Sequence, residues 1–140
     1  IREELEAIRP MKGVFHRDYV KKLDGTWVKK GATKWDLAQM LIEDIESFKT
    51  DNGLDRLVMI WCGSTEIYLE RSAVHDNMEA FEKGLRNNDP NIPPSMIYAY
   101  AAVKTSTPYA SGAPNLSVDI PALRELSRET GTPICGKDFK

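Results

Sequence analysis

Cysteine, surplus charge and long apolar segments are all scarce in this sequence. Two cysteines among 140 residues cannot build a disulfide framework or supply four thiolates to a zinc ion. The 19 Lys and Arg residues against 21 Asp and Glu give a formal net charge of −2, without the basic surplus of a nucleic-acid-binding protein. The longest apolar runs, residues 57–62 and 96–103, are too short to cross a bilayer. The composition therefore predicts no nucleic-acid partner, no membrane partner and a reducing, cytoplasmic setting.

What is present is the composition of a folded domain, with 41% hydrophobic and 29% charged residues. No internal repeat and no Gly/Ser-rich linker divides the chain. The first residue is Ile1, which leads directly into a helical pattern, and the last, Lys140, follows neither a polar tail nor a helix stop signal. We therefore expect residues 1–140 to be a piece of a longer chain.

Five segments have the pattern of helices. The clearest is 34–50, where apolar residues recur at helical spacing, Thr33 and Asp36 form a capping-box pair, and Gly53 supplies a left-handed stop. The segment 96–104 is apolar on nearly all sides, which predicts a buried helix. The predicted helices and their caps are 2–9, 34–50 after Thr33, 76–87 capped by Asp76, 96–104 capped by Ser95, and one capped by Asp119 and ended by Gly131.

Short apolar segments between these helices are predicted strands. Residues 56–62 form an apolar run without alternation, which is typical of a parallel strand covered on both faces. Two further strands are predicted at 108–110 and 133–135, and 13–16 is a short strand candidate. Strands separated by helices form βαβ units, so the predicted fold class is α/β, with a mostly parallel, open sheet and helices on both faces.

Three polar segments that contain glycine follow the three predicted strands. They are Gly63-Ser64-Thr65, Ser111-Gly112-Ala113 and Gly136-Lys137-Asp138. Ligands of open α/β sheets bind beyond the carboxyl ends of the strands, so these segments predict a ligand site. Each segment taken alone is also compatible with an ordinary turn.

Several other patterns do not support a site. Residues 131–137 have the glycine and lysine spacing of a phosphate-binding P-loop, but a helix precedes them and no Ser or Thr follows the lysine. His16 and His75 lack the spacing of metal ligands, so no metal site is predicted. Cys62 and Cys135 end predicted buried strands, where a cysteine usually acts as a small apolar residue.

Five motifs, read in order along nearly the whole chain, resemble the myo-inositol-1-phosphate synthase family. The segments are WCGSTE at 61–66, HDNME at 75–79, IPPSMIYA at 92–99, SGAP at 111–114 and GKDFK at 136–140. They are similar to the family's WTANTE, NDTME, ISPSTLYA, NGSP and GDDFK. The departures, at residues 62–64, Ala113 and Lys137, are similar to the divergent prokaryotic branch and affect side-chain contacts more than backbone contacts.

The resemblance implies an NAD-dependent conversion of D-glucose 6-phosphate to a myo-inositol monophosphate. The reaction proceeds by oxidation, enolisation, intramolecular aldol closure and reduction, with no net redox change, so the enzyme is an isomerase (an intramolecular lyase). Residues 1–140 would be the central and C-terminal part of a Rossmann-like NAD-binding domain in a homotetramer. The catalytic and tetramerisation domain would lie outside this chain, and the isolated piece would be inactive.

The resemblance also implies the residues of the cofactor site. They are Gly13, Val14, Cys62, Gly63, Ser64, Thr65, Gly112, Ala113 and Asp138. Asp138 and Lys140 would lie near the reacting centre, while the main catalytic lysines lie outside the chain. Two alternatives remain at this point: a non-catalytic α/β module that kept the scaffold, and a fragment of an unrelated NAD(P) dehydrogenase.

Overall fold

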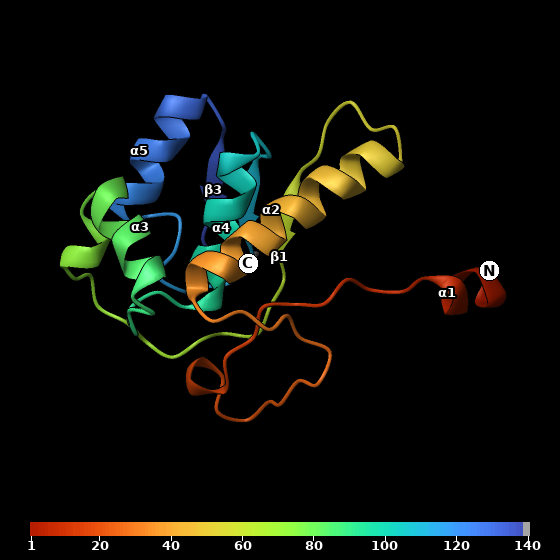
Figure 1. Ribbon diagram of the computed structural model, residues 1–140, viewed down its shortest axis with the longest axis horizontal. Coiled ribbons are helices and arrows are strands. Elements are labelled where there is room, and N and C mark those ends of the chain that lie inside the picture. The colour runs from red at the N-terminus through yellow and green to blue at the C-terminus, as the bar shows by residue number, and fades with distance from the viewer. Residues whose placement is uncertain (139–140) are drawn as a thin grey trace.

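The computed structural model describes residues 1–138, and within them three parallel strands form an open sheet in the order β1-β2-β3 (Figure 1). The strands are β1 (Met59–Trp61), β2 (Tyr109–Ser111) and β3 (Ile134–Gly136). Met59 pairs with Tyr109, and Tyr109 pairs with Ile134. The predicted open, parallel sheet is confirmed. β1 is shorter than the predicted strand 56–62.

Five α-helices precede or separate the strands, and every predicted helix is present. Their bounds are α1 (Arg2–Ala7), α2 (Lys34–Asp51), α3 (Met78–Arg86), α4 (Pro94–Lys104) and α5 (Pro121–Thr130), with single 3₁₀ turns at η1 (Arg17–Tyr19) and η2 (Ala73–His75). α1 stands apart from the body of the molecule at the end of an extended segment (Figure 1). In the described chain, no helix has the length and apolar character needed to cross a membrane.

The predicted strand at 13–16 is wrong. Gly13 forms only an isolated parallel bridge with Val28. Its amide donates to the carbonyl of Trp27 at 3.2 Å, and its carbonyl accepts from the amide of Lys29 at 2.8 Å. The segment is held by this loop rather than by the sheet.

The predicted capping box of α2 and the predicted glycine stop of α5 are confirmed, whereas the cap of α3 is one residue away from the predicted one. Thr33 Oγ1 accepts from the Asp36 amide at 3.1 Å, and Asp36 Oδ2 accepts from the Thr33 amide at 2.9 Å, which completes the predicted capping box of α2. Gly131 ends α5 in the left-handed conformation, with φ of 65°. Asn77, rather than the predicted Asp76, caps α3 by accepting from the Ala80 amide at 2.8 Å.

The predicted caps Ser95 and Asp119 are also wrong. α4 begins at Pro94, so Ser95 lies inside its first turn, and α5 begins at Pro121 with Ile120 as its N-cap. Proline at the first helical position is favoured because its fixed φ suits the helix and the missing amide has no intrahelical partner there. In both cases the proline, rather than the nearby polar side chain, marks the start of the helix.

The strand order explains why the helices that connect the strands, α3, α4 and α5, lie on one side of the sheet, with α4 against β2. β1, β2 and β3 follow one another in a single direction, and right-handed crossovers that step in one direction place their helices on the same side. On the other side, Ile60 is 57% exposed and Cys135 is exposed. The second helical layer of the predicted fold would require a reversal of strand order, which these three strands do not contain.

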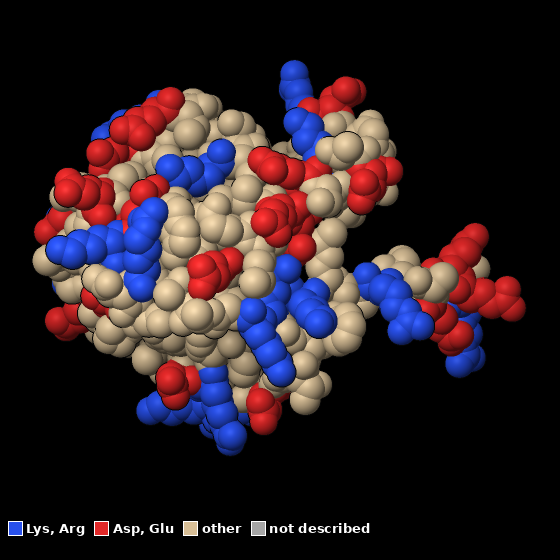
Figure 2. Space-filling view, viewed as in Figure 1, with Lys and Arg blue, Asp and Glu red and all other residues tan. Residues whose placement is uncertain are grey.

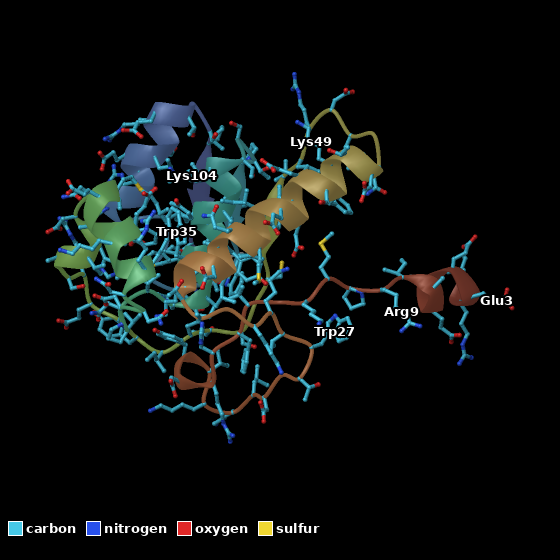
Figure 3. The ribbon with its side chains drawn as sticks, in the orientation of Figure 1. Glu3, Arg9, Trp27, Trp35, Lys49 and Lys104 are labelled. Atoms are coloured by element: carbon cyan, nitrogen blue, oxygen red, sulfur yellow. The ribbon has the colours of Figure 1, made fainter. Side chains whose placement is uncertain are left out.

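α4 is the centre of the core, as its apolar sequence predicted. Nine of its eleven residues are buried, and it packs against α2, α5 and β2. Its Tyr100 ring lies 5.8 Å from the ring of Phe81 on α3 and 6.3 Å from that of Trp35 on α2. Trp35 and Lys104 lie within the helical body, whereas Trp27 lies beside the N-terminal segment (Figure 3).

The charged side chains are mixed on the surface. In Figure 2, lysine and arginine side chains alternate with aspartate and glutamate over the visible face, including the projecting N-terminal segment. This distribution agrees with the nearly balanced charge of the sequence.

A lysine is buried at the start of α2. Lys34 is 5% exposed, and its ammonium donates to Tyr19 Oη at 2.7 Å, to the Asp89 carbonyl at 2.6 Å and to the Ile92 carbonyl at 2.8 Å. Burial lowers the pKa of Lys34 to about 8, although the negative charges of Asp89 and Asp18 oppose that shift. The lysine thus joins α2 to η1 and to the loop before α4.

Replacing Lys34 with methionine should lower the free energy of unfolding by about 2–4 kcal/mol, because the buried Ile92 carbonyl loses its donor and the Asp89 carbonyl and the Tyr19 hydroxyl each lose a charged one. Urea denaturation of the two proteins measures this difference. Lys30→Met is the matched control, since Lys30 is exposed and its loss should change stability by less than about 0.5 kcal/mol. Equal midpoints for Lys34→Met and the unsubstituted protein would contradict the prediction.

Candidate functional site at the carboxyl edge of the sheet

The three polar segments predicted from the sequence follow neighbouring strands at one edge of the sheet. Because β1, β2 and β3 are parallel, their carboxyl ends meet at that edge. The amide of Gly112 donates to the carbonyl of Trp61 at 2.9 Å, which joins the end of β1 to the segment that follows β2. The structure therefore gathers residues 62–65, 112–113 and 137–138 as expected.

The segment after β1 is open to solvent. Cys62, Gly63, Ser64 and Thr65 are all exposed, so their backbone groups and two hydroxyls are accessible to a ligand. A Cβ at Gly63 would lie 2.5 Å from the indole of Trp61, so this packing of Trp61 requires glycine. The cysteine interpretation is wrong, because Cys62 and Cys135 are both exposed rather than buried. Cys62 follows β1 and Cys135 lies in β3, and both are outer strands of this sheet.

The segment after β2 is more tightly held. Ser111 is fully buried and its hydroxyl donates to the carbonyl of Ala113 at 3.2 Å. Ala113 is 4% exposed, and Gly112 is half-buried. A ligand at this segment would meet mainly backbone groups.

The segment after β3 carries a charged pair. Lys137 Nζ lies 2.7 Å from Asp119 Oδ2, in the loop before α5. Burial raises the pKa of the Asp119 carboxyl, but the hydrogen bonds from Lys137 and the Ser117 amide outweigh burial and hold that pKa below its ordinary value. Asp138 adopts a left-handed conformation, with φ of 67°. Lys140, expected near the reacting centre, lies outside the described residues.

A tyrosine connects Gly13 and Val14 to the carboxyl end of β1. The amide of Val14 donates to Tyr98 Oη at 2.9 Å, and the ring of Tyr98 lies 5.2 Å from that of Trp61, the last residue of β1. Burial raises the pKa of the Tyr98 phenol. Tyr98 therefore connects the segment at 13–14 with the strand end.

Two cavities adjoin this edge of the sheet. One, of about 560 Å³, is lined by residues 65–71, 114–116 and Lys137. Another, of about 420 Å³, lies beside β3; Lys137 lines both cavities, and Asp119 lines only this one. Of the residues predicted to bind a cofactor, Thr65 alone lines the larger cavity.

Three buried polar residues beside the segments were not assigned to a site from the sequence. Glu66, Ser95 and Asn115 are 5%, 0% and 6% exposed, and they are joined by hydrogen bonds. The only sequence signals were that Glu66 and Asn115 lie within or beside glycine-containing motifs and that Ser95 lies within the motif at 92–99. Their burial depends on the packing of α4 against the strand ends, which no local pattern reports.

Nothing in residues 1–138 resembles a metal centre, because no three His, Cys, Asp or Glu side chains gather as ligands would. His75 is fully buried; its Nδ1 accepts from the Ser72 amide at 3.1 Å and its Nε2 lies 2.8 Å from the Asn91 carbonyl. Both ring nitrogens therefore have structural partners.

Comparison with known proteins gives one family over the whole chain. An NAD-binding sequence model described as myo-inositol-1-phosphate synthase matches residues 1–140. Inositol-3-phosphate synthase 1 of Bacteroides thetaiotaomicron is 46% identical over 141 residues, covering 100% of this chain and 33% of that protein. Inositol-3-phosphate synthase of Saccharomyces cerevisiae is 30% identical over 154 residues, covering 100% of this chain and 28% of that protein.

The same fold occurs in a solved structure. The crystal structure of inositol-3-phosphate synthase from Caenorhabditis elegans matches with a TM-score of 0.87 at 24% identity, covering 99% of this chain and 29% of that one. The chain thus has the Rossmann-like fold that the resemblance implied, and it spans about a third of the length of the first of these relatives. NAD is the cofactor of the matched domain. The chain belongs to the myo-inositol-1-phosphate synthase family.

Proposed function

We propose that residues 1–140 are the central and C-terminal part of the NAD-binding domain of a synthase that converts D-glucose 6-phosphate to a myo-inositol monophosphate. The main support is that the family match extends over all 140 residues, including the three segments that meet at the carboxyl edge of the sheet. The catalytic domain and the contacts of a homotetramer would lie outside this chain, in a cytoplasmic enzyme.

The residues at this edge fit a dinucleotide. Glycines and hydroxyl side chains leave backbone groups accessible after β1, and this edge is where ligands of such sheets bind. We assign Cys62, Gly63, Ser64, Thr65, Gly112 and Ala113 to contacts along the cofactor, with Gly13 and Val14 held nearby by Tyr98. When bound there, NAD would accept a hydride from the sugar in the oxidation and return it in the reduction.

Asp138 has a separate role in this proposal. It follows β3 directly after Lys137, beside the segment that follows β2, because Gly136 pairs with Ser111. We place Asp138, with Lys140, near the reacting centre. Lys137, between Gly136 and Asp138, forms an ion pair with Asp119.

The full-length protein, supplied with D-glucose 6-phosphate and NAD, should form inositol monophosphate without net formation of NADH. Phosphorus NMR follows the product, and absorbance at the NADH band follows the cofactor. Accumulation of NADH in step with substrate loss would instead identify a dehydrogenase. Binding of NAD without any product would favour the non-catalytic module.

A further inference from the structure

Glu66 is a buried acid directly after the exposed segment 62–65. The residue is 5% exposed. Its Oε1 accepts from the Ser95 amide at 2.9 Å, and its Oε2 accepts from the Ser95 hydroxyl at 2.5 Å and from Asn115 Nδ2 at 3.1 Å. Each of these three donors is a neutral N–H or O–H group rather than a lysine or arginine.

The carboxylate replaces the missing cap of α4. The N-cap of that helix is Pro93, which makes no capping hydrogen bond through its side chain. The Ser95 amide is one of the first-turn donors that have no partner inside a helix. A negative charge at this end is favoured by the helix dipole, which helps to offset the cost of burying Glu66. Burial raises the pKa of Glu66, and the hydrogen bonds from Ser95 and Asn115 partly oppose that rise.

Asn115 joins the same carboxylate to the segment after β2. Its Oδ1 accepts from the Glu66 amide at 3.1 Å, while its Nδ2 donates to Glu66 Oε2. The side-chain amide thus meets both the backbone and the side chain of Glu66. The segments that follow β1 and β2 are bound to each other and to the first turn of α4 by one buried group.

We propose that Glu66 is a positioning residue for the cofactor site, holding residues 62–65 and 112–115 in a fixed relation on the first turn of α4. This inference rests on the proposed function, because those segments are the ones assigned to NAD. Glu66 itself does not contact the cofactor in this proposal. It acts through the backbone of its neighbours.

The test exchanges the side-chain carboxylate of Glu66 and the side-chain amide of Asn115 between the two positions. Glu66→Gln keeps only one of the two acceptor oxygens, so its NH₂ group faces either Asn115 Nδ2 or, if the new amide rotates, the Ser95 amide, and two donors face each other in both orientations. Rotating the Asn115 amide would only move the conflict to the backbone amide of residue 66. In the double variant Glu66→Gln/Asn115→Asp, the carboxylate introduced at position 115 accepts through both oxygens, one from the backbone amide and one from the side-chain amide of residue 66. The negative charge of the pair is retained.

In the full-length protein, Glu66→Gln should raise the Kd for NAD about tenfold, a penalty of about 1.4 kcal/mol, and the double variant should restore it to within about threefold. Glu125→Gln is the matched control, because Glu125 accepts from the Met78 amide at the start of α3 at 3.0 Å, away from both segments. Its Kd for NAD should be unchanged. A Glu66→Gln protein with the unsubstituted Kd, or a double variant no better than the single one, would overturn the inference.

Hydrogen exchange on the ligand-free protein separates this inference from the proposed function. The amides of residues 62–66, of Ala113 and of residues 115–117 should exchange faster in Glu66→Gln and recover in the double variant. If they do so in a protein that binds no NAD, the connection between the segments is established and the cofactor assignment fails. If NAD binds but exchange at these amides is unaffected, Glu66 does not position them.

Discussion

Replacing Gly136 with alanine should lower the free energy of unfolding by about 3–5 kcal/mol and weaken NAD binding more than tenfold, which makes it among the most damaging single substitutions in the chain. Gly136 ends β3 with φ of 136°, a conformation that side chains strongly disfavour. A Cβ there would lie 2.7 Å from the carbonyl oxygen of Ser111 and 2.8 Å from its Cβ. The first of these atoms is backbone, so the contact cannot be relieved by rotating a side chain.

The damage should reach the candidate site because Gly136 pairs with Ser111. Separating the two strand ends would displace residues 137–138 from the segment that follows β2. Gly131→Ala is the matched control, since Gly131 also has a positive φ, of 65°, but no atom lies within 4 Å of its Cβ position. Its cost should be about 1 kcal/mol, with no change in NAD affinity.

Urea denaturation and NAD titration of the full-length protein measure both effects. Equal losses of stability in Gly136→Ala and Gly131→Ala would show that backbone conformation alone matters at both positions. In that case the close approach of β3 to Ser111 would not be needed for the site.

Local chemistry explains which parts of the fold could be predicted. The capping box of Thr33 and Asp36 and the glycine stop at Gly131 are formed by residues three positions or fewer from the helix end, so the sequence pattern contains all the partners. Asp119 and Ser95 fail as predicted caps because Pro121 and Pro94 mark the helix starts. Their side chains pair instead with Lys137 and Glu66, which come from distant segments.

The same distinction between local and distant partners applies to the candidate site. The glycine-containing segments were predicted because their composition and their place after strands are local features. Their connection through Glu66, Asn115 and Tyr98 could not be predicted, because it requires α4 to lie against the strand ends. The exposure of Cys62 also follows from topology, since it depends on β1 being an outer strand of this sheet.

Expressed alone, the 140-residue chain should self-associate through β1, and lysines at Val58 and Ile60 should abolish the association. Val58, directly before β1, is 65% exposed, and Ile60, within β1, is 57% exposed. Residues two positions apart in extended backbone point to the same face. Ile60 is in register with Ala110, which pairs with the exposed Cys135. An apolar row beside an unpaired strand edge is a common route to association between copies.

Sedimentation over a range of concentrations should show a rising average mass for the unsubstituted chain and a constant, monomeric mass for Val58→Lys/Ile60→Lys. Leu5→Lys is the control, because Leu5 is 62% exposed but lies on α1, apart from the sheet (Figure 1). That variant should associate like the unsubstituted chain. If Leu5→Lys alone produced the monomer, α1 would be the contact. A chain that stays monomeric without any substitution would show that the open face of this sheet does not by itself drive association.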